Sequence, residues 1–126
     1  MTDQIEVLLV DEDTDVLELA ETFLEQSEDL SVTAVTSVSD ALDTFESGAI
    51  DCVVSDYTMP EMSGGDLLEE IRNRDASVPF FLFTGRDERE ISEEIDTEGP
   101  TGYVRKGEGP DQYRQLADDI RDAVNR

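Results

Sequence analysis

The stretch that decides the fold is Cys52-Val53-Val54-Ser55, which runs directly into Asp56-Tyr57-Thr58-Met59-Pro60. Its apolar part has the length of a β-strand, and an aspartate and a turn-forming proline follow it. Further apolar runs of similar length occur at residues 5–10, 32–35, 80–84 and 103–105. The sequence therefore predicts five short strands.

Segments with helical spacing separate these runs. Apolar residues recur three or four positions apart at Val16, Leu19/Ala20 and Phe23; at Ala41, Leu42 and Phe45 within residues 40–47; at Leu67/Leu68 and Ile71; at Ile91 and Ile95; and at Leu116, Ile120 and Val124. Strict alternation of strands and helices is typical of a parallel sheet with helices on both faces. Residues 7–10 and 80–83 are apolar without alternation, as inner strands are, whereas residues 32–35 are more mixed and suit an edge. We predict an α/β fold with a doubly wound five-stranded parallel sheet, order 2-1-3-4-5, and five helices, a flavodoxin-like arrangement.

Length and charge restrict the possible functions. A chain of 126 residues has the size of one domain, and we expect a single domain over residues 1–126.

Its 33 acidic residues against 9 basic ones give a formal net charge of -24, which should repel DNA and anionic membranes. Because the carboxylates are spread along the chain, they indicate a solvated acidic surface, as in proteins adapted to high salt. A nucleic-acid mimic is the alternative.

The N-terminus and the apolar runs indicate a cytoplasmic protein, and the single cysteine indicates a buried side chain. Residues 1–4 lack the basic region and apolar stretch of a signal peptide, and no apolar run approaches the roughly 20 residues of a membrane span. Cys52 has no partner for a disulfide and lies in an apolar run, so we expect a small buried side chain rather than a redox group.

Polar residues end four of the expected strands, and in such sheets ligands bind at the carboxyl ends. These ends are Asp11-Glu12-Asp13, Ser55-Asp56-Tyr57, Thr84-Gly85 and Arg105-Lys106-Gly107. Crowded carboxylates favour a cation among them, and hard oxygen ligands with room for water suit magnesium. Asp56 could then attack an activated phosphorus atom, while Lys106 and Thr84 balance the charge of the transferred group.

Each of these residues also has a simpler interpretation. Acidic triplets are common in a chain with 33 carboxylates, and Thr84 could cap a helix that starts near Arg86. A lone lysine is usually exposed. However, Lys106 is the only lysine in the chain, which makes its place at a strand end informative.

Four elements in order resemble the receiver domain of bacterial and archaeal response regulators, over essentially the whole chain. They are residues 8–12 (LLVDE), 51–60 (DCVVSDYTMP, continued by Ser63-Gly64), 82–85 (LFTG) and 102–106 (GYVRK). The likeness is to single-domain chemotaxis regulators, and with the acidic composition it suggests a halophilic archaeal source.

The resemblance implies a role for each matching position. Asp56 would accept the phosphoryl group. Asp11 and Glu12 would hold Mg²⁺ together with Asp56 and the backbone carbonyl of Thr58, with Asp13 as an alternative ligand. Thr84 would be the switch hydroxyl, Lys106 the lysine that pairs with the phosphoryl group, and Tyr103 the aromatic side chain that changes rotamer on activation.

The resemblance also implies partners. A sensor histidine kinase or phosphotransfer protein would supply the phosphoryl group. Phosphorylation would change the face formed by the fourth helix, fifth strand and fifth helix, which a downstream protein or a covalently linked output domain would recognise. The chain would be a phosphorelay signalling domain that assists its own phosphorylation and dephosphorylation, not an enzyme. Whether it acts alone or as part of a longer regulator stays open.

Three positions depart from the family pattern. Glu12 is one methylene longer than the usual Asp, Gly107 replaces a proline that commonly follows a cis bond, and Gly85 replaces a small residue, often alanine. Because of these departures, a receiver-like interaction domain that does not cycle phosphate remains an alternative. A phosphatase with an aspartate nucleophile is disfavoured because Thr58 stands where it needs a second aspartate. A flavin carrier is disfavoured because its phosphate loop would be acidic here.

Overall fold

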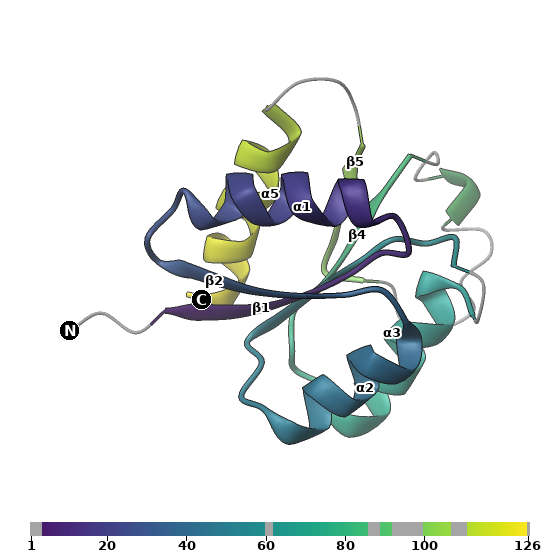
Figure 1. Ribbon diagram of the computed structural model, residues 1–126. Helices are drawn as coiled ribbons and strands as arrows, with labels where there is room; N and C mark the ends of the chain where they lie inside the picture. The colour runs from purple at the N-terminus through teal and green to yellow at the C-terminus, as the bar shows by residue number, and fades with distance from the viewer. Residues whose placement is uncertain (1–3, 60–61, 86–88, 92–99, 107–110, 126) are drawn as a thin grey trace.

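In the computed structural model, the five strands form one parallel sheet (Figure 1). The structure describes residues 4–59, 62–85, 89–91, 100–106 and 111–125. The strands are β1 (Ile5–Val10), β2 (Leu30–Val35), β3 (Cys52–Ser55), β4 (Phe80–Thr84) and β5 (Gly102–Arg105). Their order is β2-β1-β3-β4-β5, which confirms the predicted doubly wound sheet with the second strand at an edge.

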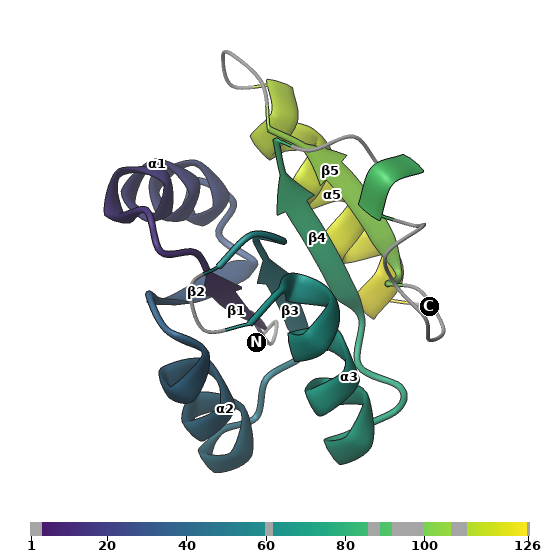
Figure 2. The ribbon, with the colours of Figure 1, turned by 90° about the vertical axis from the view of Figure 1, so that its right-hand side faces the viewer.

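Helices cover both faces of this sheet, as Figures 1 and 2 show from two directions. The helices are α1 (Thr14–Glu25), α2 (Val38–Ser47), α3 (Gly64–Arg74) and α5 (Asp111–Val124). Helices α1 and α5 lie on one face, and α2 and α3 on the other. Residues 89–91 are helical and fall in the predicted fourth helix, whose remaining residues 92–99, with Ile95, lie outside the described part of the chain.

Side-chain caps set where three helices begin. Asp13 caps α1 and accepts the backbone N–H groups of Asp15 and Val16. Ser37 caps α2, and Ser63 caps α3 in a capping box with Asp66. Each cap satisfies N–H groups that have no partner within the helix. Asp13 lies in the connection from β1 to α1 and Ser63 in the connection from β3 to α3, so both caps fix where the chain returns to a helix after these strands.

Two apolar cores lie on the two faces of the sheet. One joins strand residues such as Val7 and Phe83 to α1 and α5, and the other joins Leu8 and Leu82 to α2 and α3. Strands β3 and β4 are buried at every position, as expected for inner strands of a parallel sheet. Cys52 is buried as predicted, and burial raises the pKa of its thiol well above the ordinary value.

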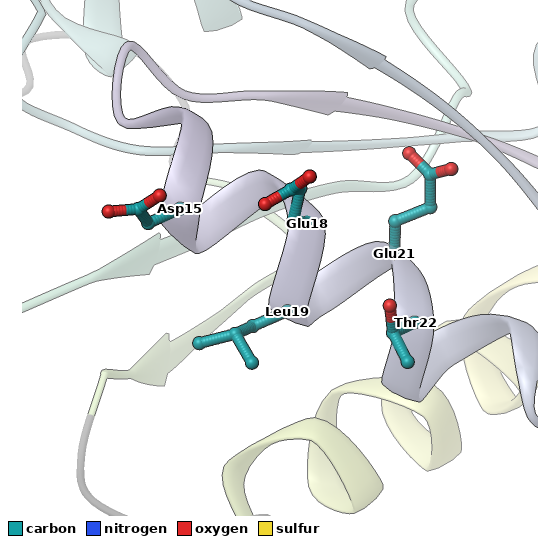
Figure 3. A pocket seen from close by; sticks show the side chains of 5 residues that line it. All are labelled: Asp15, Glu18, Leu19, Glu21 and Thr22. Carbon is teal, nitrogen blue, oxygen red and sulfur yellow. The ribbon is translucent and has the colours of Figure 1, made fainter.

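For one residue of the apolar stripe in α1, the expectation of burial is wrong. Leu19 in α1 is 53% exposed, while Leu17, Ala20 and Leu24 form the buried face of this helix. Val16 and Phe23 pack against the edges of this buried face, and Leu19 falls on the opposite, solvent side of the helix. It lines a hollow on the surface of α1 together with Asp15, Glu18, Glu21 and Thr22 (Figure 3).

The strand register brings the strand ends to one edge. Val10 of β1 pairs with Ser55 of β3, so Asp11 and Asp56 leave the sheet side by side, and the Asp56 N–H donates to the Val10 carbonyl at 2.9 Å. On the other side, the Lys106 N–H donates to the Thr84 carbonyl at 2.8 Å. Among the described residues, no helix combines the length and the apolar character that crossing a membrane requires.

Candidate functional site at the carboxyl ends of the strands

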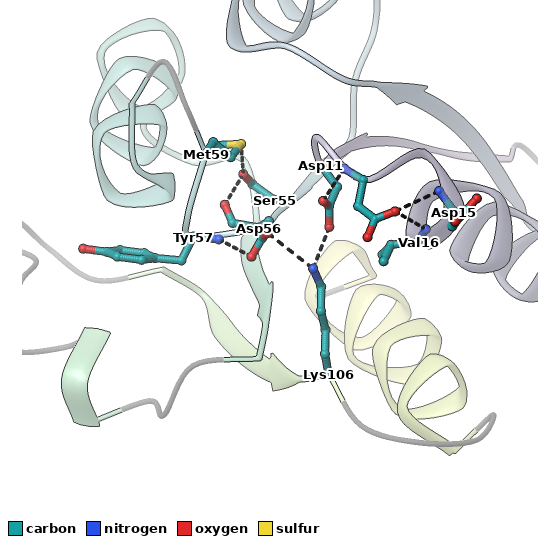
Figure 4. A network of polar contacts seen from close by, with 9 residues as sticks. Asp11, Asp15, Val16, Ser55, Asp56, Tyr57, Met59 and Lys106 are labelled. Atoms are coloured by element: carbon teal, nitrogen blue, oxygen red, sulfur yellow. Dashed lines mark hydrogen bonds and ion pairs between the residues drawn. The ribbon is translucent and has the colours of Figure 1, made fainter.

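One ammonium group bridges two carboxylates that are distant in sequence (Figure 4). Lys106 Nζ lies 2.7 Å from Asp11 Oδ2 and 3.4 Å from Asp56 Oδ2. The Asp11 side chain is 3% exposed, that of Asp56 14% and that of Lys106 23%. The residues predicted to meet at the ends of β1, β3 and β5 therefore do meet, in a partly buried site that solvent still reaches.

Backbone N–H groups orient both carboxylates. Asp11 Oδ1 accepts the N–H of Asp13 at 2.9 Å, and Asp56 Oδ1 accepts the N–H of Tyr57 at 2.7 Å. In each aspartate the other oxygen, Oδ2, faces Lys106. The loops after β1 and β3 thus hold one oxygen and present the second toward the same point.

The charge of Lys106 is stabilised by its partners. Burial alone would lower the pKa of this ammonium, but the hydrogen bond with Asp11 and the charge of Asp56 outweigh burial and raise the pKa above its ordinary value. Lys106 Nζ also lies 5.7 Å from the centroid of the Phe83 ring, on the ring face, where a cation is attracted. Lys106 is therefore protonated at neutral pH.

A glycine makes close approach to the backbone around Asp56 possible. The Gly64 N–H donates to the Tyr57 carbonyl at 2.6 Å. A Cβ at position 64 would lie 2.6 Å from the Asp56 carbonyl oxygen and 2.9 Å from Tyr57 Cα, closer than side chains pack. The start of α3 is thus packed directly against the loop that carries Asp56.

The donor set fits a magnesium ion held by few protein ligands. Two carboxylates facing one ammonium leave a net negative charge, and both supply hard oxygen atoms. In the described part of the chain, no group of three or more acidic, histidine or cysteine side chains gathers in a way that could hold a metal ion. Magnesium is commonly bound through one or two carboxylates with several waters, so a pair of carboxylates is sufficient.

The other expected metal ligands differ in their surroundings. Glu12 and Thr58 are exposed beside the site. Asp13 uses Oδ1 to accept the N–H groups of Asp15, at 3.0 Å, and Val16, at 3.3 Å. The structure thus shows Asp13 acting as the cap of α1. Its position just before a helical pattern is the sequence signal that could have predicted this cap.

Of the expected switch residues, Thr84 lies at this edge, and Tyr103 lies two residues before the end of β5. Thr84 lies at the end of β4 and is buried, with 3% of its surface exposed. Its carbonyl oxygen accepts a hydrogen bond from the backbone N–H of Lys106. Tyr103 in β5 is half-buried and packs against the core on the α2 and α3 side. Gly107, the departure after Lys106, lies outside the described residues.

Sequence reasoning missed the aromatic residues behind Lys106. Tyr113 of α5 stacks on Phe23 of α1, with ring centroids 4.9 Å apart and an interplanar angle of 2°. It also packs against Phe83, at 5.7 Å and 56°. Burial raises the pKa of Tyr113; the charge of Lys106 opposes this effect and that of Asp11 adds to it. Periodicity marks such rings only as core residues.

The fold and the site define a class: a doubly wound α/β domain with an aspartate and a lysine at the switch edge of its sheet. The family model of the response regulator receiver domain matches residues 7–118. The chain belongs to the response regulator receiver domain family of two-component systems, a family of signalling domains.

Curated relatives support this assignment. Response regulator SaeR of Staphylococcus aureus (strain USA300) is 30% identical over 120 residues, which cover 95% of this chain and 50% of SaeR. The chain thus spans about half the length of the curated relatives it matches.

Solved structures share the fold. A receiver domain protein from Clostridium thermocellum matches with a TM-score of 0.83 and 27% identity, over 97% of this chain and 95% of that chain. The chemotaxis response regulator CheY4 of Vibrio cholerae matches with a TM-score of 0.80 and 21% identity, over 93% and 98% of the two chains. These relatives are bacterial, and the comparisons do not support the expected halophilic archaeal source.

Proposed function

We propose that this chain is a phosphoacceptor domain, in which Asp56 receives a phosphoryl group in a magnesium-dependent reaction. The single observation that carries the proposal is the convergence of Asp11, Asp56 and Lys106, with Lys106 Nζ 2.7 Å and 3.4 Å from the two carboxylates. Family membership adds the class of reaction, because receiver domains of two-component systems work with histidine kinases in general.

The chemistry requires a nucleophile and a means to balance charge. The Asp56 carboxylate would form a new P–O bond as the P–N bond of a phosphohistidine breaks, with the electron pair leaving on the imidazole nitrogen. The protonated Lys106, which already faces Asp56 Oδ2, would then pair with a phosphoryl oxygen. A histidine kinase or phosphotransfer protein would serve as the donor.

Magnesium would be held by Asp11 and Asp56, with Glu12 and the Thr58 carbonyl at the solvent side of the site. When bound, the ion neutralises charge on the transferring phosphoryl group. Response regulator TrrA of Thermotoga maritima, which matches with a TM-score of 0.79 and 24% identity over 93% of this chain and 99% of that one, was solved in complex with Mg(2+)-BeF. That structure supports the proposal that the fold binds magnesium in this chain as well.

The proposal includes a switch at the adjacent strand ends. Thr84 would move toward the phosphoryl group and Tyr103 would fill the space that it leaves, which would change the face formed by the fourth helix, β5 and α5. A downstream protein or a linked output domain would recognise that face. Loss of the Thr84 hydroxyl in Thr84→Ala should therefore separate phosphorylation from switching.

The proposal also covers the domain and its location. Residues 1–126 would form one receiver domain that acts in the cytoplasm, without contacting nucleic acid or membrane directly. The formal charge of -24 supports this, because anionic surfaces would repel it.

Incubation with acetyl phosphate and Mg²⁺, followed by intact-mass measurement, tests the function directly. We expect a gain of one phosphoryl group in the wild-type protein and none in Asp56→Asn. Asp43→Asn, which removes an exposed carboxylate from α2, is the matched control and should retain the gain. The measurement is made at low and at high salt because the acidic chain repels itself at low ionic strength.

Two results would contradict the proposal. If the wild-type protein gained no phosphoryl group at any salt concentration, the chain would be a receiver-like interaction domain. If Asp56→Asn gained the group as the wild type does, the nucleophile would be another residue.

A further inference from the structure

Three aromatic rings connect helix α1 to the lysine of the site. Phe23 of α1 stacks on Tyr113, which lies in the first turn of α5, and Tyr113 packs against Phe83 of β4. The face of the Phe83 ring lies 5.7 Å from Lys106 Nζ. We call Phe23, Tyr113 and Phe83 the aromatic stack.

Two rings of the aromatic stack are buried in the core, and the third, Phe23, packs against them. Tyr113 is 7% exposed and Phe83 is 2% exposed, and both belong to the core between the sheet and helices α1 and α5. The near-parallel arrangement of Phe23 and Tyr113, with an angle of 2°, leaves Tyr113 little room to rotate without losing its partner. Phe83 therefore has a buried, stacked ring as its neighbour on the side that faces α5.

Lys106 needs such support because its polar contacts are temporary. In this structure its ammonium is held by Asp11 and Asp56. Under the proposed function, both carboxylates take new partners, a metal ion and a phosphoryl group. The Phe83 ring is the contact of the ammonium that this chemistry leaves in place.

We propose that Tyr113 is a positioning residue that holds Phe83, and through it the Lys106 ammonium, in place beside Asp56. This inference rests on the proposed function and deepens it. It assigns a role in phosphoryl transfer to a residue in helix α5 that contacts none of the reacting groups. The charges of Lys106 and Asp11 both act on the Tyr113 hydroxyl, which agrees with its nearness to the site.

The sequence offers a direct probe of Lys106. Because Lys106 is the only lysine in the chain, a sample labelled with ¹³C-lysine gives one side-chain ε-CH₂ signal by NMR. A proton beside the face of an aromatic ring is shifted by that ring, so the signal reports the position of the ammonium relative to Phe83. The measurement requires neither magnesium nor phosphorylation.

Substitutions at Tyr113 should separate positioning from packing. Tyr113→Leu keeps an apolar side chain but removes the ring, and we expect the ε-CH₂ signal to move toward its value in the unfolded chain. Tyr113→Phe keeps the ring and should restore the wild-type signal. Ile120→Ala, which creates a cavity farther along the same buried face of α5, is the control for general loosening and should leave the signal unchanged.

The rate of phosphorylation gives a second readout. At saturating Mg²⁺, Tyr113→Leu should reduce the initial rate with acetyl phosphate by about tenfold, because small displacements of a charge-balancing group are costly in the transition state. Tyr113→Phe should react at the wild-type rate. Magnesium affinity, measured by calorimetry, should be the same in all three proteins.

The lysine signal decides the inference independently of the proposed function. An unchanged signal in Tyr113→Leu, or an equal shift in Ile120→Ala, would overturn it. If Tyr113→Leu does not fold, Phe23→Leu removes the outer ring instead, and we expect a smaller shift in the same direction; no shift would overturn the inference. Absence of any phosphorylation in the wild-type protein would refute the proposed function, while the lysine signal would still test the position of Lys106.

Discussion

Lys106 donates to Asp11 at 2.7 Å, a shorter contact than the 3.4 Å that separates the same ammonium from Asp56. The lysine therefore occupies the carboxylate that the proposed magnesium ion needs. Under the proposed function, a magnesium ion at Asp11 would compete with the ammonium for this carboxylate, while Asp56 and the Phe83 ring would remain as contacts of the ammonium.

Removing the charge of Lys106 should strengthen magnesium binding. We expect Lys106→Met to lower the Kd for Mg²⁺ by about tenfold, since one unit charge within about 4 Å changes the interaction by at least about 1 kcal/mol even at the dielectric constant of water. Arg105→Met removes the same charge from the neighbouring, exposed position and is the control. Calorimetric titration gives both values, and equal affinities in the two variants would contradict a competition between Lys106 and the metal.

Two glycines near the site should respond differently to alanine. In Gly64→Ala the new Cβ would clash with the Asp56 carbonyl oxygen and Tyr57 Cα, so we expect a loss of about 1–3 kcal/mol in the free energy of unfolding. In Gly85→Ala the Cβ would meet none of the described atoms within 4 Å, and the stability should stay close to that of the wild type. Urea denaturation of both variants measures the difference in the free energy of unfolding. Equal losses in the two variants would show that the close approach at Gly64 does not cause the destabilisation.

The two roles considered for Asp13 can be separated by substitution. Asp13→Ala removes the cap of α1 and should lower the free energy of unfolding by about 1 kcal/mol, whereas Asp13→Asn keeps a side-chain acceptor and should lower it less. If Asp13 acts only as a cap, Asp13→Asn will leave the Kd for Mg²⁺ nearly unchanged. Glu12→Gln should weaken binding measurably. A larger effect on affinity in Asp13→Asn than in Glu12→Gln would assign the ligand role to Asp13.

A second ion pair should make stability depend on pH. Arg121 contacts Asp29 through Nε at 2.7 Å and Nη2 at 3.2 Å, which ties the end of α5 to the segment before β2. The hydrogen bond from Arg121 holds the pKa of Asp29 below its ordinary value of 3.8. The contribution of Asp29 is therefore complete above pH 3.8 and is lost as the pH falls through the lower pKa of the folded state.

Comparison of Asp29→Asn with the wild type measures this contribution. Because both side chains are about one-third exposed, solvent screening limits the loss at pH 7 to at most about 1 kcal/mol. The difference between the two proteins should begin to shrink below pH 3.8 and vanish only once the pH has fallen through the lower pKa of Asp29 in the folded state. Asp43→Asn, which removes an exposed carboxylate from α2, should show no such pH dependence, and a difference for Asp29→Asn that persists at low pH would point to packing rather than charge.

Much of the candidate site followed from the sequence because the topology of parallel strands is restrictive. Once the runs at residues 5–10, 52–55, 80–84 and 103–105 were recognised, their carboxyl ends had to share one edge. The meeting of Asp11, Asp56 and Lys106 was therefore predictable without coordinates. The contact of Lys106 with Asp11 in preference to Asp56 was not, because it depends on side-chain geometry.

The order of apolar and polar residues along this chain is enough to specify the strands, their order and the edge where the polar groups collect, because these depend on local periodicity and on the handedness of crossovers. Packing between distant segments settled the remaining features: Leu19 turned to solvent and Tyr113 placed behind Lys106. Such features arise from the rotation of each helix about its own axis and from which rings meet across the core. Those are properties of three-dimensional contact that spacing along a chain does not record.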